Sequence, residues 1–465
     1  MSARGGIRGL AEVPRLADHE LAVEEVRSDP LAFLEQATRR CGDLFRYEAG
    51  GWSTVFLNRP EYVRQVLQSG PDRYSKLGTP DLMMLKPMLG DGLMTSEGAS
   101  WERQRHTAQP AFAHGEIVAF VGLMTKATDQ MLARWGRVCD TGEVIDVELE
   151  LNRLTIQIVA HCLFGMDLSD EGADVGAAIA RMNDYMAYYD SGDRVRQAEF
   201  EAASLTVERI VHRILLERRL LLSMRSATAT TLPTGASLGG GNDLLGRLLA
   251  AHAGAAATAA VPSIRDQIFT YLMAGHETTA KALTWTLYLL DRHPGVLARL
   301  RLEVDRVVGE CPVTPGCIEG LGYTRMVLQE AMRLFPPVWL MSRRCVRDEA
   351  VDGCRIPAGT LVIVSPYTLH RHADYWSQPL LFDPDRFDPR RRDREPYTFF
   401  PFSGGPRSCI GRSFAMVETV VVLAAIVRQF DLRARPGHHA RREALVTLRP
   451  AGGMPMTVAS RPPRA

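Results

Sequence analysis

The sequence lacks the cysteine pairs that build zinc sites and disulfide frameworks. Eight cysteines are scattered through 465 residues, and none of them belongs to a Cys-x-x-Cys pair. Neither a zinc ribbon nor a disulfide-rich fold is therefore indicated. Cys311 and Cys317 flank a short Pro-Val-Thr-Pro-Gly segment, where we expect free thiols rather than a disulfide. This use of cysteine fits a reducing cytoplasm.

Long apolar runs and an excess of charge of one sign are also missing. No run of about 18 apolar residues occurs, so we predict no membrane span. The N-terminus contains no apolar core long enough for a signal peptide. The formal net charge is only +1, which gives no overall attraction to nucleic acids or acidic membranes. We therefore expect a soluble, cytoplasmic, monomeric protein that binds no nucleic acid.

The residues that are present indicate a globular protein with a large core. Hydrophobic residues make up 46% of the chain and charged residues 23%, an ordinary balance for such a protein. The length suggests about two to four domains, although large single folds exist. Hydrophobic periodicity predicts a helix that starts at Asp29-Pro30 and mostly helical chain from Trp101 to about Leu222, including 146–165 and 197–222. Further helices are predicted near 61–68, 262–291, 295–309, 321–335 and 412–429. Strand signals occur at 45–57, 354–365 and 444–456.

Several stretches are expected to be irregular. Residues 1–30 form a lead-in, residues 74–100 form a long loop rich in Gly, Pro, Met and Leu, and residues 372–398 are rich in Pro, Asp and Arg. The low-complexity stretch 223–241 predicts a mobile loop. Helical chain resumes at Asp243, so this loop does not indicate a domain boundary. The predicted fold class is mainly α with a small β part.

One stretch has a composition that neither a helix nor a strand favours. It follows the pattern Phe402-x-x-Gly405-x-Arg407-x-Cys409-x-Gly411 and leads into an apolar helix. A thiolate at a helix N-terminus is favoured by unpaired backbone N–H groups and by the helix dipole. The glycines would let the backbone fold tightly and approach something flat and bulky. For an isolated cysteine, the alternative is a glycine-rich turn with an inert thiol in the core.

The longest predicted helix carries a polar motif among apolar neighbours. Because Thr278 follows Ala274 by four residues, its hydroxyl can bond to the carbonyl of Ala274 and open the helix locally. His276 and Glu277 also begin a pattern found in zinc proteases. Ala280 occupies the position of the second histidine, so that reading fails.

Two further pairs have helical spacing. Glu330 and Arg333 lie three residues apart, on one helical face, where they can form an ion pair. A surface salt bridge of little worth is the alternative for this pair. Trp101 and Arg105 lie one helical turn apart in another predicted helix.

In this order and spacing, the four motifs resemble those of the cytochrome P450 family of haem-thiolate enzymes. The segment Phe382-Asp-Pro-Asp-Arg-Phe387 agrees as well, and the resemblance extends from about Asp29 to Pro455. It implies one cytochrome P450 domain over residues 1–465. That fold is a triangular prism of helices, with the haem between the long central helix and the cysteine-bearing helix. The segments around Arg343-Arg344 and from Thr447 onward resemble those of bacterial soluble members with eukaryotic-like motifs.

The resemblance implies roles for the cysteine motif and the long-helix motif. Cys409 is implied to be the axial thiolate ligand of haem b (iron protoporphyrin IX), with Phe402 shielding its sulfur. Glu277 and Thr278 are implied to deliver protons while O2 is activated. Ala274 is implied to lie against the haem, and the glycines of both motifs are expected to give clearance to the porphyrin.

The remaining motifs are implied to hold the cofactor and the core. The propionates are implied to pair with Trp101, Arg105, Arg407 and either Arg343 or Arg344, and the family's spacing favours Arg343. Gly411 completes the cofactor-binding set. Glu330, Arg333 and Arg386 are implied to form a buried structural triad, whose loss leaves an unpaired charge.

The implied activity is a monooxygenase that inserts one oxygen atom from O2 into a lipophilic terpenoid, polyketide, fatty acid or carotenoid, in bacterial secondary metabolism. The implied substrate pocket includes Met83, Met84, Val338, Leu340 and Met454. The chain shows no flavin or nicotinamide fingerprint, so electrons from NAD(P)H are expected through ferredoxin and ferredoxin reductase. The alternatives are a haem-thiolate peroxygenase or isomerase, and a non-catalytic binder of an apolar ligand. The acid–Thr pair favours O2 activation over both.

Overall fold

The computed structural model describes residues 9–70, 72–187, 193–227, 243–252, 257–391 and 393–461. The chain divides into two units. Unit 1 comprises residues 1–85, 330–409 and 442–448, and unit 2 comprises residues 86–329, 410–441 and 449–465. The single domain expected over 1–465 stays a prediction.

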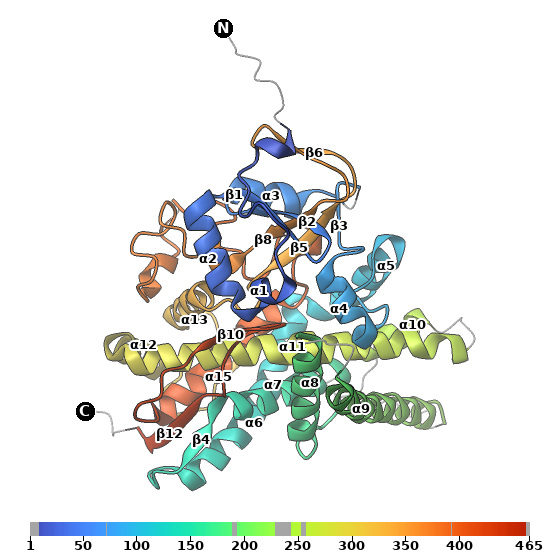
Figure 1. Ribbon diagram of the computed structural model, residues 1–465. Coiled ribbons are helices and arrows are strands. Elements are labelled where there is room, and N and C mark those ends of the chain that lie inside the picture. The colour runs from blue at the N-terminus through green and yellow to red at the C-terminus, as the bar shows by residue number, and fades with distance from the viewer. Residues whose placement is uncertain are drawn as a thin grey trace. The chain divides into compact units, whose positions relative to one another are not determined.

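Unit 1 contains a five-stranded sheet with the strand order β1-β2-β8-β5-β3 (Figure 1). Its strands are β1 (Leu44–Ala49), β2 (Trp52–Leu57), β3 (Tyr74–Ser75), β5 (Met341–Cys345) and β8 (Leu361–Val364). β1 and β2 form the hairpin predicted at 45–57, and Gly50 and Gly51 take positive φ angles of 57° and 76° at its turn. β2 pairs in parallel with β8, which pairs antiparallel with β5. Apolar side chains on the sheet form the core of this unit.

Short helices and strands complete unit 1. They are η1 (Leu10–Glu12), α1 (Val23–Ser28), α2 (Pro30–Cys41), α3 (Pro60–Gln68), β6 (Glu349–Val351), β7 (Cys354–Ile356), α14 (Pro366–Leu369), η4 (Pro384–Phe387), η5 (Gly405–Arg407) and β10 (Arg442–Ala444). α2 begins where the sequence predicts, because the Asp29 carboxylate accepts a hydrogen bond from the Ala32 N–H at 3.0 Å and Pro30 occupies the first turn.

Unit 2 is mainly helical. Its helices are α5 (Gly98–Ala108), η2 (Gln109–Phe112), α6 (His114–Val138), α7 (Val147–Phe164), α8 (Gly172–Ala187), α9 (Arg194–Ala227), α10 (Leu244–Ala251), α11 (Ala257–Arg292), α12 (Pro294–Val307), η3 (Pro315–Cys317) and α15 (Arg412–Gln429). Its sheet has the order β4-β12-β9, from β4 (Val144–Asp146), β9 (Phe430–Ala434) and β12 (Pro455–Ser460). Three elements cross the division of the chain, namely α4 (Pro80–Leu89), α13 (Gly322–Leu334) and β11 (Leu448–Pro450).

The long helix α11 packs along α7 within unit 2 (Figure 1). The Thr155 hydroxyl of α7 donates to the backbone carbonyl of His276 at 3.0 Å. A Cβ atom on Gly275 would lie 2.9 Å from Val159 of α7, so glycine allows the two helices to approach this closely. α7 thus packs directly against α11 at the polar motif.

The structure corrects several boundaries. The loop predicted over residues 74–100 is wrong, since α4 occupies Pro80–Leu89 and α5 begins at Gly98. Pro80 stands in the first turn of α4, where proline is tolerated, and Pro87 lies inside it, which hides this helix in the sequence. The lead-in contains the short helix α1, and the strand run 354–365 is two strands, β7 and β8. Residues 223–227 of the predicted loop belong to α9, and 228–241 lie outside the described residues.

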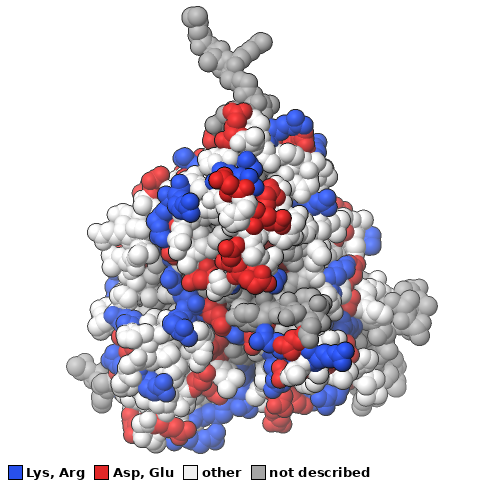
Figure 2. All heavy atoms as spheres, in the orientation of Figure 1, with Lys and Arg blue, Asp and Glu red and all other residues white. Residues whose placement is uncertain are grey.

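Acidic and basic side chains are interspersed over the face shown in Figure 2, in keeping with the small net charge. Within the described part of the chain, no helix is sufficiently long and apolar to span a bilayer. Cys311 and Cys317 do not form a disulfide, as expected.

Candidate active site

Cys409 lies at the end of a tight loop in unit 1. Its backbone N–H donates to the Phe402 carbonyl at 2.9 Å, which closes the loop. Ser403 adopts a positive φ of 60° and Gly405 one of 64°, so the loop contains two left-handed residues. The Cys409 side chain is exposed, and α15 begins three residues further along the chain. The loop therefore presents a thiol instead of burying it, which argues against the inert core cysteine.

The glycines of this loop serve packing within unit 1. A Cβ on Gly405 would lie 2.0 Å from the carbonyl oxygen of Leu67 in α3, and one on Gly404 would lie 2.4 Å from the Tyr397 ring. The expectation that the glycines of this loop give clearance to a porphyrin stays a prediction. Glycine is required because the loop lies directly on α3 and Tyr397. Gly275 has a comparable explanation, since its missing side chain faces α7.

The polar motif of α11 forms an exposed window in a helix that is otherwise mostly buried. Ala274 is exposed and Thr278 is half-buried, whereas Leu272, Met273 and Ala280 are buried. The Thr278 hydroxyl donates to the Ala274 carbonyl at 2.9 Å, as its spacing predicts. Ala274 and Thr278 share a helical face, so this window is a patch of small and hydroxyl-bearing side chains.

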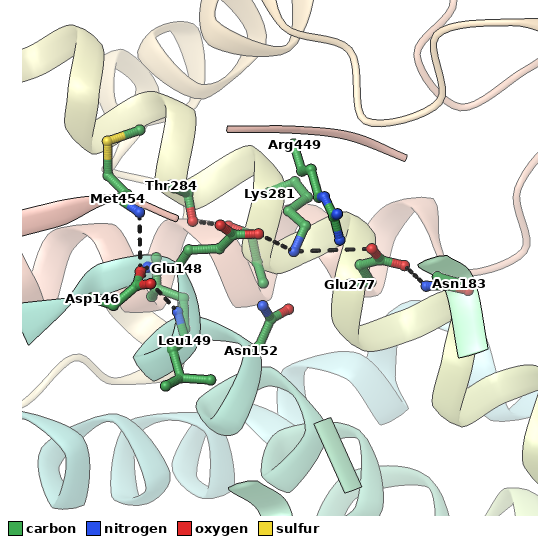
Figure 3. Close-up of polar contacts among 12 residues, drawn as sticks. Asp146, Glu148, Leu149, Asn152, Asn183, Glu277, Lys281, Thr284, Arg449 and Met454 are labelled. Atoms are coloured by element: carbon green, nitrogen blue, oxygen red, sulfur yellow. Dashed lines mark hydrogen bonds and ion pairs between the residues drawn. The ribbon is translucent and has the colours of Figure 1, made fainter. Parts of the chain in front are cut away.

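Glu277 is buried and belongs to a polar cluster with Lys281 and Asn183 (Figure 3). Asn183 of α8 donates to its carboxylate at 2.5 Å, and the Lys281 ammonium lies 3.9 Å from its other oxygen. Lys281 in turn lies 2.5 Å from Glu148 of α7. Burial raises the pKa of Glu148, although Lys281 acts in the opposite direction.

Glu330, Arg333 and Arg386 meet in unit 1. Arg333 forms two hydrogen bonds with Glu330, at 2.7 and 2.8 Å, and Arg386 lies 3.3 Å from the same carboxylate. Both Glu330 and Arg333 are fully buried, which is incompatible with the weak surface pair considered as the alternative. The remaining Arg333 donors bond to three backbone carbonyls, those of His370, Pro379 and Leu381. One arginine thereby fixes the irregular chain that precedes the cysteine loop.

His370 connects this triad to the cysteine loop. Its Nε2 accepts a hydrogen bond from the Phe400 N–H at 3.0 Å, so the ring is in the neutral tautomer with the proton on Nδ1. Burial, together with the nearby Arg333 charge, lowers the pKa of His370 well below its usual range. The ring therefore acts as a fixed acceptor for the backbone just before the loop.

The predicted propionate partners come from three elements. Trp101 and Arg105 are both half-buried on α5 in unit 2. In unit 1, Arg343 and Arg344 are neighbours on β5 and point to opposite faces of the sheet. Arg343 is 8% exposed and donates to the Ser342 carbonyl, whereas Arg344 is exposed. Arg407 is half-buried in η5.

The predicted substrate residues are placed as follows. Met83 is exposed and Met84 is half-buried on α4. Val338 and Leu340 are half-buried and pack against the apolar clusters on the sheet of unit 1. Met454 is fully buried in unit 2, and its backbone N–H donates to Asp146 at 3.0 Å. Met454 is thus the one of these five residues whose side chain lies entirely within the core.

Sequence reasoning missed Lys281, Glu148 and Asn183. One signal was available, since Lys281 follows Glu277 by four residues within the apolar part of α11. No local pattern identifies Glu148 or Asn183, because their contacts with α11 depend on how α7 and α8 pack.

Comparison with known proteins identifies the class. Residues 21–452 match the family model Cytochrome P450. The chain is 32% identical to a cyclooctatin synthase of Streptomyces melanosporofaciens, over 93% of this chain and 91% of that protein. It is 30% identical to an ultra-long-chain fatty acid omega-hydroxylase of Homo sapiens (88% and 80%) and 32% identical to leukotriene-B4 omega-hydroxylase 3 of Mus musculus (80% and 74%). The chain thus belongs to the cytochrome P450 family of haem-thiolate monooxygenases.

Proposed function

We propose that this monooxygenase inserts one oxygen atom from O2 into a lipophilic small molecule of the terpenoid, polyketide, fatty acid or carotenoid class. The observation that supports this most directly is the α11 window, where the Thr278 hydroxyl bonds to the Ala274 carbonyl beside the acid Glu277. An acid and a hydroxyl side by side are the groups needed to supply protons to O2 as it is reduced. The relatives' names, which include two omega-hydroxylases, are compatible with an apolar substrate.

The residues present fit a haem b cofactor. A thiolate is a strong iron ligand, and Cys409 is an exposed thiol on a loop that backbone packing holds in place. When bound, the haem supplies the iron at which O2 is activated. By family membership, Phe402 would shield the sulfur, and Gly411 and Ala274 would contact the haem. Trp101, Arg105, Arg343 and Arg407 would be the donors for the two propionates.

The protein's own groups prepare proton transfer. The Thr278 hydroxyl gives its hydrogen to the Ala274 carbonyl, which leaves its oxygen free to accept a further hydrogen bond. Glu277 is held in the buried cluster by the hydrogen bond that Asn183 donates. It reaches the window by rotating its side chain, so proton transfer requires release of the Asn183 bond.

NAD(P)H would supply the electrons through a ferredoxin and its reductase. The printed residues contain no flavin or nicotinamide fingerprint of their own. We expect reduction by a surrogate ferredoxin–reductase pair, and not by NAD(P)H alone.

The test is the optical spectrum of the reduced, CO-bound protein. Thiolate ligation gives a strongly red-shifted Soret band, which we expect for the native protein and not for Cys409→Ser. Cys311→Ser, which removes another exposed thiol, is the matched control and should keep the band. A folded native protein without the red-shifted band would refute the assignment.

Substrate class is tested by the spin-state change that follows displacement of the axial water. A panel of one fatty acid, one diterpene, one carotenoid and one macrolide ring should contain at least one ligand that shifts the native Soret band. Hydrophilic probes such as glucose should give no shift, and a response to those alone contradicts the proposed class.

A further inference from the structure

Unit 2 buries three charged side chains together, close to the motif of α11. The side chains of Lys281, Glu277 and Glu148 are only 4%, 8% and 11% exposed. The Lys281 ammonium lies 2.5 Å from Glu148 and 3.9 Å from Glu277, so it is shared unequally between two carboxyl groups (Figure 3).

The cluster combines two carboxyl groups with one ammonium. One of the carboxyl groups therefore either carries a proton or remains as a buried negative charge that draws on more distant cations. Arg449 is such a cation, and it is paired with the more exposed Asp184 at 2.7 Å. Among the residues that the structure describes, Asp146 and His276 are further titratable groups that act on the cluster. Burial lowers the pKa of His276, so it adds no positive charge near neutral pH.

Polar groups from α7 and α8 complete the surroundings of Glu277. Asn183 holds the Glu277 carboxylate through its amide nitrogen at 2.5 Å. The amide oxygens of Asn183 and Asn152 are buried and have no hydrogen-bond partner among the residues that the structure describes. Asn152 extends from α7 toward the same cluster (Figure 3). Two acceptors are thus available to a protonated carboxyl group or to a buried water.

Stability does not explain this arrangement. A buried ion pair costs much desolvation, and well-packed uncharged residues in its place are often as stable or more so. The pair Lys281–Glu148 nevertheless adjoins the one acid beside Thr278, and Lys281 stands one helical turn from that acid.

We propose that Lys281 and Glu148 are positioning residues for Glu277. Lys281 attracts the Glu277 carboxyl away from the α11 window while Asn183 holds it, and Glu148 limits that attraction by neutralising most of the ammonium charge. The ion pair thereby sets how readily Glu277 is released toward Thr278. This inference rests on the proposed function of Glu277 as a proton donor.

The experiment separates charge from packing with Lys281→Met, Glu148→Gln and the double variant that combines them. Each haem-loaded protein is unfolded in urea at pH 6 and pH 8. Each is also supplied with NADPH and a surrogate ferredoxin–reductase pair, and the fraction of consumed O2 released as H2O2 is measured between pH 6 and 8.5. Arg301→Met combined with Asp431→Asn removes another partly buried ion pair, 2.7 Å long, and is the matched control.

We expect Lys281→Met to lower stability more at pH 8 than at pH 6. Without the ammonium, the pKa of Glu148 rises further, so the folded state resists ionisation that the unfolded chain permits. The double variant should regain most of that stability. Its H2O2 fraction should nevertheless differ several-fold from that of the native protein and follow a shifted pH profile, while the control variant keeps the native profile.

Two results would overturn the proposal. One is a double variant with both native stability and a native H2O2 profile, which makes the pair purely structural. The other is a control variant whose H2O2 fraction changes as much as that of the double variant. Failure of the proposed function is distinguishable, because the native protein then lacks the red-shifted CO band while the urea measurements keep their meaning.

Discussion

At the scale of single residues, Arg333 forms a set of hydrogen bonds that lysine cannot reproduce. It bonds to both oxygens of Glu330 and to three backbone carbonyls in a fully buried site. Lysine keeps the charge but has three donors in place of five and no planar fork. We expect Arg333→Lys to lower the free energy of unfolding by about 3 kcal/mol or more, since buried partners lose their bonds.

Urea unfolding of the haem-loaded protein measures this loss. Arg390→Lys is the matched control, because the Arg390 side chain is 89% exposed in its pair with Asp388. Exposed pairs contribute little, so the control should change stability by less than about 0.5 kcal/mol. Equal effects of the two substitutions would contradict the special role of Arg333.

Thr278 permits a second prediction at this scale. Thr278→Ala removes the hydroxyl that bonds to the Ala274 carbonyl, whereas Thr278→Ser keeps it. We expect the alanine variant to release several times more of the consumed O2 as H2O2 than the native protein, and the serine variant to stay near the native value. Peroxide and O2 are measured together with a surrogate ferredoxin–reductase pair. Equal peroxide fractions in all three proteins remove Thr278 from proton delivery.

At the scale of elements, the cysteine loop depends on its contact with α3. Gly405 has a φ of +64°, and an added Cβ would lie 2.0 Å from the Leu67 carbonyl oxygen. The left-handed conformation alone costs a residue with a side chain about 1–2 kcal/mol, and backbone cannot move aside cheaply. We expect Gly405→Ala to displace the loop and to abolish the red-shifted CO band in most molecules.

The control for this change is another glycine-to-alanine substitution. Gly122 is exposed within α6, and an added Cβ would have nothing within 4 Å. Gly122→Ala should keep the CO band and raise the unfolding free energy by about 0.5–1 kcal/mol, because alanine favours the helix. A Gly405→Ala protein with a native spectrum would show that the loop tolerates a side chain there.

Elements with a strong local signal were predictable from the sequence. The hairpin at Gly50 and Gly51 and the start of α2 at Asp29 are fixed by turn and capping chemistry. α4 was missed because proline stands inside it. β5 was missed because its sequence, Met-Ser-Arg-Arg-Cys, is strand-like only through its pairing with β8.

At the scale of the whole molecule, the site was predictable in part. The Thr278 hydrogen bond and the Glu330–Arg333 pair follow from spacing along the chain, whereas the role of Cys409 as an iron ligand stays a prediction. The contact that requires glycine at position 405 and the residues that surround Glu277 could not be predicted in this way. Both depend on chain segments that are remote in sequence. Spacing along the chain indicates which side chains share a helical face, whereas tertiary packing decides which hydrogen bonds and ion pairs they form.

Global stability should depend on pH through buried groups that fold in the neutral form. His370 has a lowered pKa because of burial, so the unfolded chain binds its proton first as pH falls. Stability is therefore lost below about pH 6.5, the usual pKa of histidine. A buried carboxyl group acts in the opposite sense and penalises folding as pH rises.

Glu418 on α15 is such a carboxyl group. It is fully buried, and its two oxygens have no hydrogen-bond partner within the described part of the chain. Burial raises its pKa well above its usual range, so the folded protein keeps the proton while the unfolded chain releases it above about pH 4.3. With respect to Glu418, the free energy of unfolding is therefore highest at low pH. It falls as pH rises, by at most about 1.4 kcal/mol per pH unit for one group.

Glu418→Gln removes this titration but keeps the shape of the side chain. The difference in unfolding free energy between the glutamine variant and the native protein should therefore grow steadily in favour of the variant from pH 5 to pH 8. Subtracting the two curves cancels the contributions of His370 and of every other group. Glu102→Gln, at an exposed position on α5, is the control and should give a difference that is flat with pH. A flat difference for Glu418→Gln as well means that the carboxyl group ionises in the folded protein as easily as in the unfolded chain.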